Sequence, residues 1–322
     1  MTGSTGRAGR WRALVPCVLL LTACTPAISG TPQEQNVSVP LAPYVYVGAG
    51  TLGLMEAVRD TPARRFTLAF VLADQGRCAP TWGEGRSVRD PALLAEIAEV
   101  RDAGGSVSIA TGGASGTYLE SSCATAPELA NAYGDVLTAT GADTLDVDIE
   151  KDVSADLVAD ALTLLDEDRE VAITITLGVA SASEGLDTPA SALLQALAGH
   201  GADVTVNAMV MNFPEAGTRQ ESLLGAAEAV TGQIERLWPG GGRGEAYRRL
   251  GLTLMAGRDD TGELTTLADA RAVRTFARNH AIGSLGLWSL ARDNGDCPDD
   301  PTARDDCSGI SQNPFDFTRS LS

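Results

Sequence analysis

The feature that most constrains the fold is a repeated alternation of short β-rich runs with helical stretches. Residues 91–104, 157–168 and 190–201 place apolar side chains at helical spacing. Strands that alternate with helices form parallel sheets, and a series of eight favours a closed (β/α)8 barrel, or TIM barrel, over an open doubly wound sheet. Because no proline- or glycine-rich boundary divides the series, we predict a single α/β domain over residues 41–322. The β-rich runs are residues 43–48, 66–72, 106–110, 143–149, 170–177, 203–212, 250–255 and 283–290.

The residues that precede this series differ from it in character. Residues 1–23 combine arginines with an apolar run about half as long as a membrane-spanning helix, and they are predicted to be a secretion signal. Residues 21–24, Leu-Thr-Ala-Cys, resemble the lipobox of bacterial lipoproteins. That resemblance implies a lipid on Cys24 that anchors the protein to the cell membrane, outside the cytoplasm. Residues 24–40 are polar and contain prolines, and we predict that they form a flexible tether.

The chain is strongly acidic. It has 42 Asp and Glu against 24 Lys and Arg, a formal net charge of −18 at pH 7. Removal of residues 1–23 would delete arginines and no acidic residue, which makes the charge more negative. A surface of this sign repels nucleic acid and anionic lipid. We therefore expect no nucleic-acid partner, and the charge favours a neutral or cationic one.

Cysteine usage fits an oxidising compartment. Four cysteines follow the proposed lipid site, and four cysteines allow three disulfide pairings. We predict the pairs Cys78–Cys123 and Cys297–Cys307. Metal binding is the alternative, but the sequence has no CxxC spacing and 2 histidines. We therefore predict no metal site.

The fourth β-rich run continues into an acidic stretch, DTLDVDIE, at residues 143–150. Side chains alternate along a strand, so Asp146, Asp148 and Glu150 share one face and the apolar residues between them share the other. In a barrel the outer face meets the helices and must be apolar. The acids are therefore predicted to point into the barrel. Asp143 has the opposite phase and lies at the start of the strand, where a structural or capping role fits it.

Carboxylates gathered inside a barrel cannot all be ionised, so the pKa of one or more should rise. We expect a proton to be shared between Asp146 and Asp148. Glu150 comes last, at the carboxyl end of the strand, where barrel enzymes place their chemistry. A carboxylic acid held protonated there can act as a general acid. A solvated edge strand would alternate in the same way, but this run lies in the middle of a series in which both faces are covered.

The acidic stretch also resembles a known signature. The spacing Asp143-x-x-Asp146-x-Asp148-x-Glu150 matches the DxxDxDxE motif of glycoside hydrolase family 18, the chitinases and their relatives. This motif is the specific part of the resemblance, which covers residues 41–322 and all eight β-rich runs.

Three weaker matches follow the family's order along the chain. SIATGG at residues 108–113 resembles the family's SxGG segment, with an inserted Ala-Thr. NAMVMNF at residues 207–213 occupies the place of the M-x-[YM]-[DN] motif on the sixth strand. GLWSLARDNG at residues 286–295 resembles the eighth-strand segment whose tryptophan forms the floor of the sugar site.

The resemblance implies hydrolysis of β-1,4 bonds next to N-acetylglucosamine with retention of configuration. In this family the acetamide oxygen of the substrate is the nucleophile. Glu150 would protonate the leaving oxygen and later activate water, and Asp148 would orient the acetamide. Asp146 would hold the proton that lets Asp148 change partners. The resemblance implies no metal and no organic cofactor.

The same motifs supply candidate substrate-binding residues. Trp288 would stack beneath the sugar at the cleaved bond. The alternative for Trp288 is packing in the hydrophobic core. Trp82 could line the same groove or pack in the core. Met209, Met211 and Asn212 occupy the sixth-strand motif. Met211 stands where many members have a tyrosine that hydrogen-bonds the acetamide, and Asn212 stands where aspartate is common.

Lys151 is a further departure from the family pattern, because a small residue is frequent after the catalytic glutamate. An ammonium group close to Glu150 would lower the pKa of that acid and weaken its work as a proton donor.

The leading interpretation is a secreted, lipid-anchored and monomeric glycoside hydrolase that acts on N-acetylglucosamine-containing glycans. Other interpretations remain open. One is a chitinase-like lectin that has the barrel without catalysis, although all three acids of the motif are present here. Another is an endo-acting enzyme of the same family that trims other glycans. The last is a surface lipoprotein whose barrel serves as an adhesion or assembly scaffold, since a fold alone does not fix a function.

Overall fold

The computed structural model describes residue 1 and residues 38–322, except residues 49 and 51. The proposed secretion signal beyond Met1, the lipid site at Cys24 and the tether up to residue 37 lie outside the described residues. Within the described part of the chain, no helix is both long enough and apolar enough to cross a membrane.

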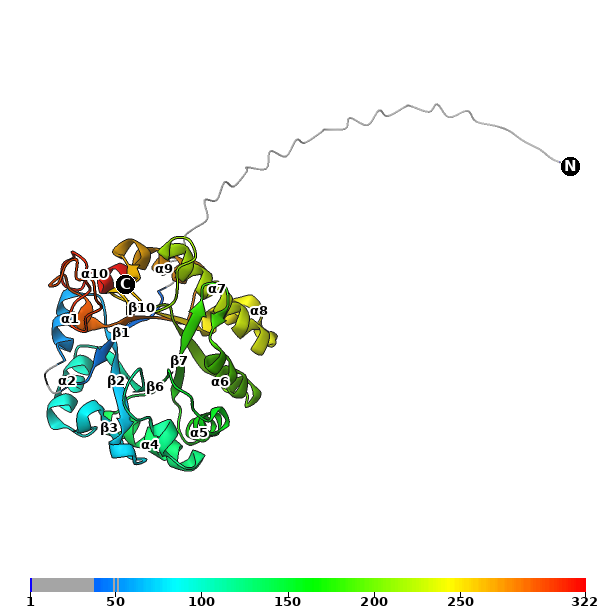
Figure 1. The fold of residues 1–322 in the computed structure, drawn as a ribbon. Helices are drawn as coiled ribbons and strands as arrows, with labels where there is room; N and C mark the ends of the chain where they lie inside the picture. Colours follow the sequence, from blue (N-terminus) through cyan, green and yellow to red (C-terminus); the bar gives the residue numbers. More distant parts are fainter. Residues whose placement is uncertain (2–37, 49, 51) are drawn as a thin grey trace. The chain divides into compact units, whose positions relative to one another are not determined.

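A closed barrel of eight parallel strands forms the centre of the fold (Figure 1). Each barrel strand pairs in parallel with its two neighbours, and pairing of the first strand with both the second and the last closes the ring. The prediction of a single-domain (β/α)8 barrel is confirmed. The barrel strands are β1 (Leu41–Tyr46), β2 (Arg65–Ala73), β5 (Ser106–Gly112), β6 (Thr144–Ile149), β7 (Ala172–Ser181), β9 (Val204–Met209), β10 (Leu250–Met255) and β13 (Ser284–Trp288).

Helices surround the barrel (Figure 1). Short strands lie in the connections, some of them antiparallel to a barrel strand. These short strands are β3 (Pro80–Trp82), β4 (Arg86–Ser87), β8 (Gly185–Leu186), β11 (Gly257–Arg258) and β12 (Leu264–Thr265). The helices are α1 (Leu54–Asp60), α2 (Pro91–Asp102), α3 (Leu119–Ser122), α4 (Ala126–Thr140), α5 (Ala155–Asp168), α6 (Thr188–Gly199), α7 (Arg219–Leu237), α8 (Gly242–Arg249), α9 (Leu267–His280) and α10 (Asp316–Leu321).

Local sequence signals explain where several of these helices begin. Asp90 accepts a hydrogen bond from the backbone N–H of Leu93 and is followed by proline at the first position of α2. Thr125 and Glu128 form a reciprocal capping box at the start of α4. Such caps satisfy backbone donors that the first helical turn leaves unpaired, so each helix starts at a defined distance from the preceding strand.

The hydrophobic core lies mainly between the strands and the helices. On β6, Leu145, Val147 and Ile149 are buried in this core, as their shared strand face predicts. A close backbone contact fixes β5, the neighbour of β6, at its carboxyl end. Gly112 of β5 has a φ of 85°, and a Cβ there would lie 1.9 Å from the carbonyl oxygen of Asp148. Only glycine allows this approach without strain.

Both predicted disulfides are present. Cys78 follows β2 and bonds to Cys123 beyond β5, which joins two neighbouring loops at the carboxyl end of the barrel. Cys297 and Cys307 close a short loop after β13.

The two bridges should contribute unequally to stability, because their sequence separations are 45 and 10 residues. Chain entropy predicts that paired Cys→Ser substitutions at Cys78 and Cys123 lower the free energy of unfolding by about 4 kcal/mol, and those at Cys297 and Cys307 by about 3 kcal/mol. Denaturant unfolding of both double variants measures the difference. A larger loss from opening the shorter loop would contradict this expectation.

Candidate active site

A cavity of about 820 Å³ opens at the carboxyl ends of the barrel strands. Asp148, Glu150 and Trp288 line it. The methionines and the asparagine of the sixth-strand motif line it as well, so most of the residues predicted to bind substrate lie around one space. These last residues are Met209, Met211 and Asn212.

Two predicted site residues lie elsewhere. Asp146 sits below this cavity and lines a second, smaller space of about 290 Å³ in the lower half of the barrel, together with Asp143. Trp82 is fully buried in the hydrophobic core and does not line the upper cavity, so of the two positions left open for it the core is the one observed. The reason is that the segment after β2 turns back as β3, whose antiparallel pairing sets Trp82 beside Val71.

Asp146 is held by hydroxyl groups inside the barrel. Tyr44 on β1 donates a hydrogen bond to Oδ2 at 2.6 Å, and Thr176 on β7 donates one to Oδ1 at 2.6 Å. Burial raises the pKa of Asp146 to about 6, and these two hydrogen bonds oppose the rise. These hydroxyl groups engage both oxygens of Asp146, and the sharing of a proton between Asp146 and Asp148 stays a prediction.

A polar network continues around this group. Asn207 on β9 donates to Thr176 at 2.9 Å and to Thr253 on β10 at 2.8 Å. All of these side chains are buried. A buried carboxyl group is tolerated here because the barrel interior supplies donors in place of water.

Asp148 lies above Asp146 and faces the upper cavity. Its side chain is buried, and its Oδ1 has no hydrogen-bond partner. Burial raises the pKa of Asp148 well above its usual value, and the charges of Glu150 and Asp146 raise it further. A buried polar atom without a partner is rare, so this oxygen is a candidate contact for a ligand.

Glu150 follows the end of β6 and is exposed toward the cavity. Its backbone N–H donates to the hydroxyl of Tyr118 at 3.1 Å, and Tyr118 in turn donates to the carbonyl of Gly113. Desolvation raises the pKa of Glu150. The ammonium of Lys151 opposes this rise, and the carboxylate of Asp260 adds to it. The net direction is upward, so Lys151 weakens the predicted proton donor without reversing its shift.

Lys151 is not among the residues that line the cavity. Its ammonium donates to the carbonyl of Gly116 at 2.9 Å and lies 4.9 Å from the centre of the Tyr118 ring.

Aromatic side chains form one wall of the cavity. Trp288 is half-buried and stacks on Phe70 of β2, with ring centroids 5.6 Å apart. Tyr44 packs against the same indole at 6.0 Å. A half-buried tryptophan that lines a cavity offers an apolar surface to a ligand, which the fully buried Trp82 cannot do.

The described residues include no cluster of His, Cys, Asp or Glu that could hold a metal ion. Several residues of the site escaped the sequence analysis. Thr176 and Asn207 carry a weak signal, since polar residues alternate with apolar ones in AITITL and VTVNAM, and Tyr44 lies outside both segments. Asp260, which lines the cavity, lies in a loop without such a pattern.

Comparison with known proteins identifies the family to which this chain belongs. No family model matches the sequence. A probable bifunctional chitinase/lysozyme of Escherichia coli is 30% identical over 288 residues, which cover 82% of this chain and 32% of that protein. The chain thus spans about a third of this curated relative and about half of a second one.

Solved structures agree. The catalytic domain of a hyperthermophilic chitinase from Pyrococcus furiosus has 30% identity and a TM-score of 0.80, over 88% of this chain and 95% of that one. A fungal endo-β-N-acetylglucosaminidase of glycosyl hydrolase family 18 shares the fold, with 16% identity and a TM-score of 0.59 over 88% of this chain and 96% of that one. The chain therefore belongs to the chitinase-like glycoside hydrolases, and its fold is that of glycosyl hydrolase family 18.

The hydroxyl of Tyr44 can be tested directly. Tyr44→Phe removes a donor that stabilises the ionised form of Asp146, so the pKa of Asp146 should rise above its value of about 6. Carboxyl-carbon NMR titration measures the shift. Tyr133→Phe is the matched control, because that hydroxyl donates to Glu120. An unchanged or lowered pKa of Asp146 in Tyr44→Phe would contradict the assigned bond.

Proposed function

We propose that the protein hydrolyses β-1,4 linkages next to N-acetylglucosamine in chitin or chito-oligosaccharides, by retaining catalysis assisted by the substrate. The proposed mechanism requires a carboxyl oxygen that is free to accept a hydrogen bond from the substrate acetamide. The unpartnered Oδ1 of Asp148, buried and facing the upper cavity, is the observation that carries it. Catalytic-site mutants of an active domain of the Pyrococcus furiosus chitinase have been solved in complex with chito-oligosaccharides, which supports a substrate of this class.

Glu150 is the proposed general acid and base. Its position at the mouth of the cavity lets it reach a glycosidic oxygen, and its raised pKa favours the protonated form that a proton donor needs. After the leaving group departs, the same carboxylate activates the water that completes hydrolysis. No metal or organic cofactor enters these steps.

Asp148 and Asp146 take the proposed supporting roles. Asp148 accepts a hydrogen bond from the acetamide N–H, which aims the acetamide oxygen at the anomeric carbon and stabilises the oxazolinium ion that forms. As positive charge develops on that ring, the ionised form of Asp148 is favoured and Asp146 can keep the proton. The hydroxyl donors of Tyr44 and Thr176 allow Asp146 to exist in either state.

Trp288 is the proposed platform for the sugar ring at the cleaved bond, where its indole is half-buried and lines the cavity. Met209 and Met211 add apolar surface beside it. Met211 cannot supply the hydrogen bond that a tyrosine gives in other members, so Asp148 carries more of the acetamide recognition. The amide of Asn212 faces Asp260.

A catalytically weak glycan-binding protein and an endo-β-N-acetylglucosaminidase acting on other glycans are the alternatives. The complete set of Asp146, Asp148 and Glu150, with the raised pKa of each, favours an enzyme. The cavity also separates an enzyme from a scaffold, because adhesion requires no enclosed acidic space. For the whole protein we propose a monomer, held outside the cytoplasm by a lipid on Cys24 or secreted, with N-acetylglucosamine-containing glycan as its partner.

Glu150→Gln tests the proposed acid. The amide cannot donate the catalytic proton, so release of the chromophore from a chromogenic chitobioside should fall by at least about 100-fold. Asp152→Asn, which changes an exposed acid two residues further on, is the control and should keep full activity. Full activity in Glu150→Gln would exclude Glu150 as the general acid, and an inactive wild type would favour the glycan-binding alternative.

Lys151→Met tests the electrostatic control of that acid. The ammonium lowers the pKa of Glu150, so its removal should raise that pKa and keep the acid protonated at higher pH. The alkaline limb of the pH profile of kcat/KM should therefore move to higher pH. Lys151→Arg retains the charge and should leave the profile in place. A shift of the Lys151→Met limb toward lower pH would contradict this assignment.

A further inference from the structure

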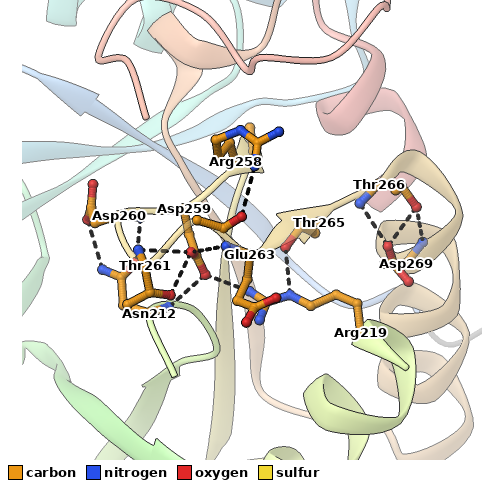
Figure 2. Close-up of polar contacts among 12 residues, drawn as sticks. Asn212, Arg219, Arg258, Asp259, Asp260, Thr261, Glu263, Thr265, Thr266 and Asp269 are labelled. Atoms are coloured by element: carbon orange, nitrogen blue, oxygen red, sulfur yellow. Dashed lines mark hydrogen bonds and ion pairs between the residues drawn. The ribbon is translucent and has the colours of Figure 1, made fainter. Parts of the chain in front are cut away.

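Asp260 is an acidic wall residue that the proposed mechanism does not use. It lies in the loop after β11 and lines the upper cavity. It forms a reciprocal pair with Asn212, in the loop after β9: Asn212 Nδ2 donates to Asp260 Oδ2 at 2.9 Å, and the Asp260 backbone N–H donates to Asn212 Oδ1 at 2.9 Å (Figure 2). The pair joins the two loops at the rim and fixes the position of the carboxylate.

A buried ion pair lies behind this contact. Arg219 at the start of α7 donates to Asp259 Oδ2 at 3.0 Å, and the two side chains are 5% and 0% exposed. Asp259 also accepts from the backbone N–H groups of Asn212, Thr261 and Glu263 (Figure 2). Asp259 is therefore fully engaged, and it holds both rim loops in place. Asp260, next in sequence, is presented to the cavity on a rigid support rather than on a free loop.

The lining of the cavity has one sign of charge. Four carboxyl groups line it, and the residues that the structure assigns to the lining include no lysine, arginine or histidine. Asp305 is one of the four and is exposed in the loop that the Cys297–Cys307 bridge closes. The whole chain, with a formal charge of −18, has the same sign. The four acidic residues are Asp148, Glu150, Asp260 and Asp305.

Three basic side chains outside the lining form hydrogen bonds or ion pairs with other groups. Arg292 is buried and donates to the carbonyl oxygen of Ala256 at 3.0 Å, and its charge also acts on the carboxylates of Asp260 and Asp305 from outside the lining. Lys151 donates to the carbonyl of Gly116, and Arg86 pairs with Asp90 at 2.8 Å. A ligand in the cavity therefore meets carboxylates whose counter-charges lie outside the lining.

We propose that Asp260, supported by Asn212 and Asp259 and assisted by Asp305, binds the ammonium group of a glucosamine unit, so that the preferred substrate is partly deacetylated chitin rather than fully acetylated chitin. This inference rests on the proposed function, because it names the glycan for the same site. The buried, unpartnered Oδ1 of Asp148 is the observation in this cavity that points to a bound ligand.

The mechanism restricts where the glucosamine can lie. The sugar whose bond is cleaved must keep its acetamide, since that group is the nucleophile. Asp260 is close enough for its charge to act on Glu150, the proposed proton donor. The ammonium is therefore expected on a unit adjoining the cleaved bond and not on the reacting sugar itself.

The test compares tetrasaccharides of defined sequence. One is fully acetylated, and each of the others carries a single glucosamine at a known position. At a pH where the sugar amine is charged, at least one glucosamine isomer should give a kcat/KM about three- to fivefold above that of the fully acetylated tetramer, chiefly through a lower KM. Added salt should reduce this ratio, because it screens the ion pair.

Asp260→Asn removes the charge while its amide oxygen can still accept from Asn212. The ratio between the best glucosamine isomer and the acetylated tetramer should fall to about one, and Asp305→Asn should lower it in part. Asp299→Asn is the matched control, an exposed acid of the same disulfide-closed loop outside the cavity lining, and it should keep the wild-type ratio. Thermal unfolding checks that each variant is folded.

The outcomes separate this inference from the proposed function. Hydrolysis of the acetylated tetramer with no isomer preferred over it would overturn the glucosamine proposal alone. A preference that survives in Asp260→Asn would also overturn it. If wild type hydrolyses neither kind of tetramer, the proposed function fails and the glucosamine proposal fails with it.

Discussion

The pleat of β6 is the constraint on which the whole site depends. Parallel pairing with β5 and β7 fixes the register of this strand, so Leu145, Val147 and Ile149 enter the core beneath the helices. The alternate positions must then face the barrel interior. A shift of one residue would put acids against the helices and apolar side chains in the cavity. The burial of three aliphatic side chains thus aims the acidic ones.

The acidic side chains are tolerated in this interior because side chains of the neighbouring strands supply hydrogen bonds to them. Tyr44, Thr176 and Asn207 form a hydrogen-bonded layer around Asp146, in a position that many barrels fill with apolar side chains. The layer leaves Asp148 as the member without a donor on Oδ1. Burying the Oδ1 of Asp148 without a hydrogen-bond partner costs stability, and this oxygen faces the space where a ligand would bind.

Much of this arrangement is predictable from sequence, for physical reasons. The strand period and the count of eight runs gave the barrel and the inward direction of the acids, and the loop positions of the cysteines agreed with both bridges. The choice between core and groove for Trp82 was not predictable, because its burial depends on an antiparallel return along β2 that has no distinct local pattern. Asp260 was missed for a similar reason. Its role depends on the ion pair between Arg219 and Asp259, which are 40 residues apart in the chain.

In the proposed mechanism, an acetamide oriented by Asp148 attacks the anomeric carbon before water does. The anomeric configuration of the first product tests this most directly. Proton NMR of a chito-oligosaccharide digest, recorded before mutarotation, should show the β-anomer first, because two displacements on one carbon retain configuration. Initial release of the α-anomer would mean direct attack by water from the opposite face, and it would contradict the role given to Asp148.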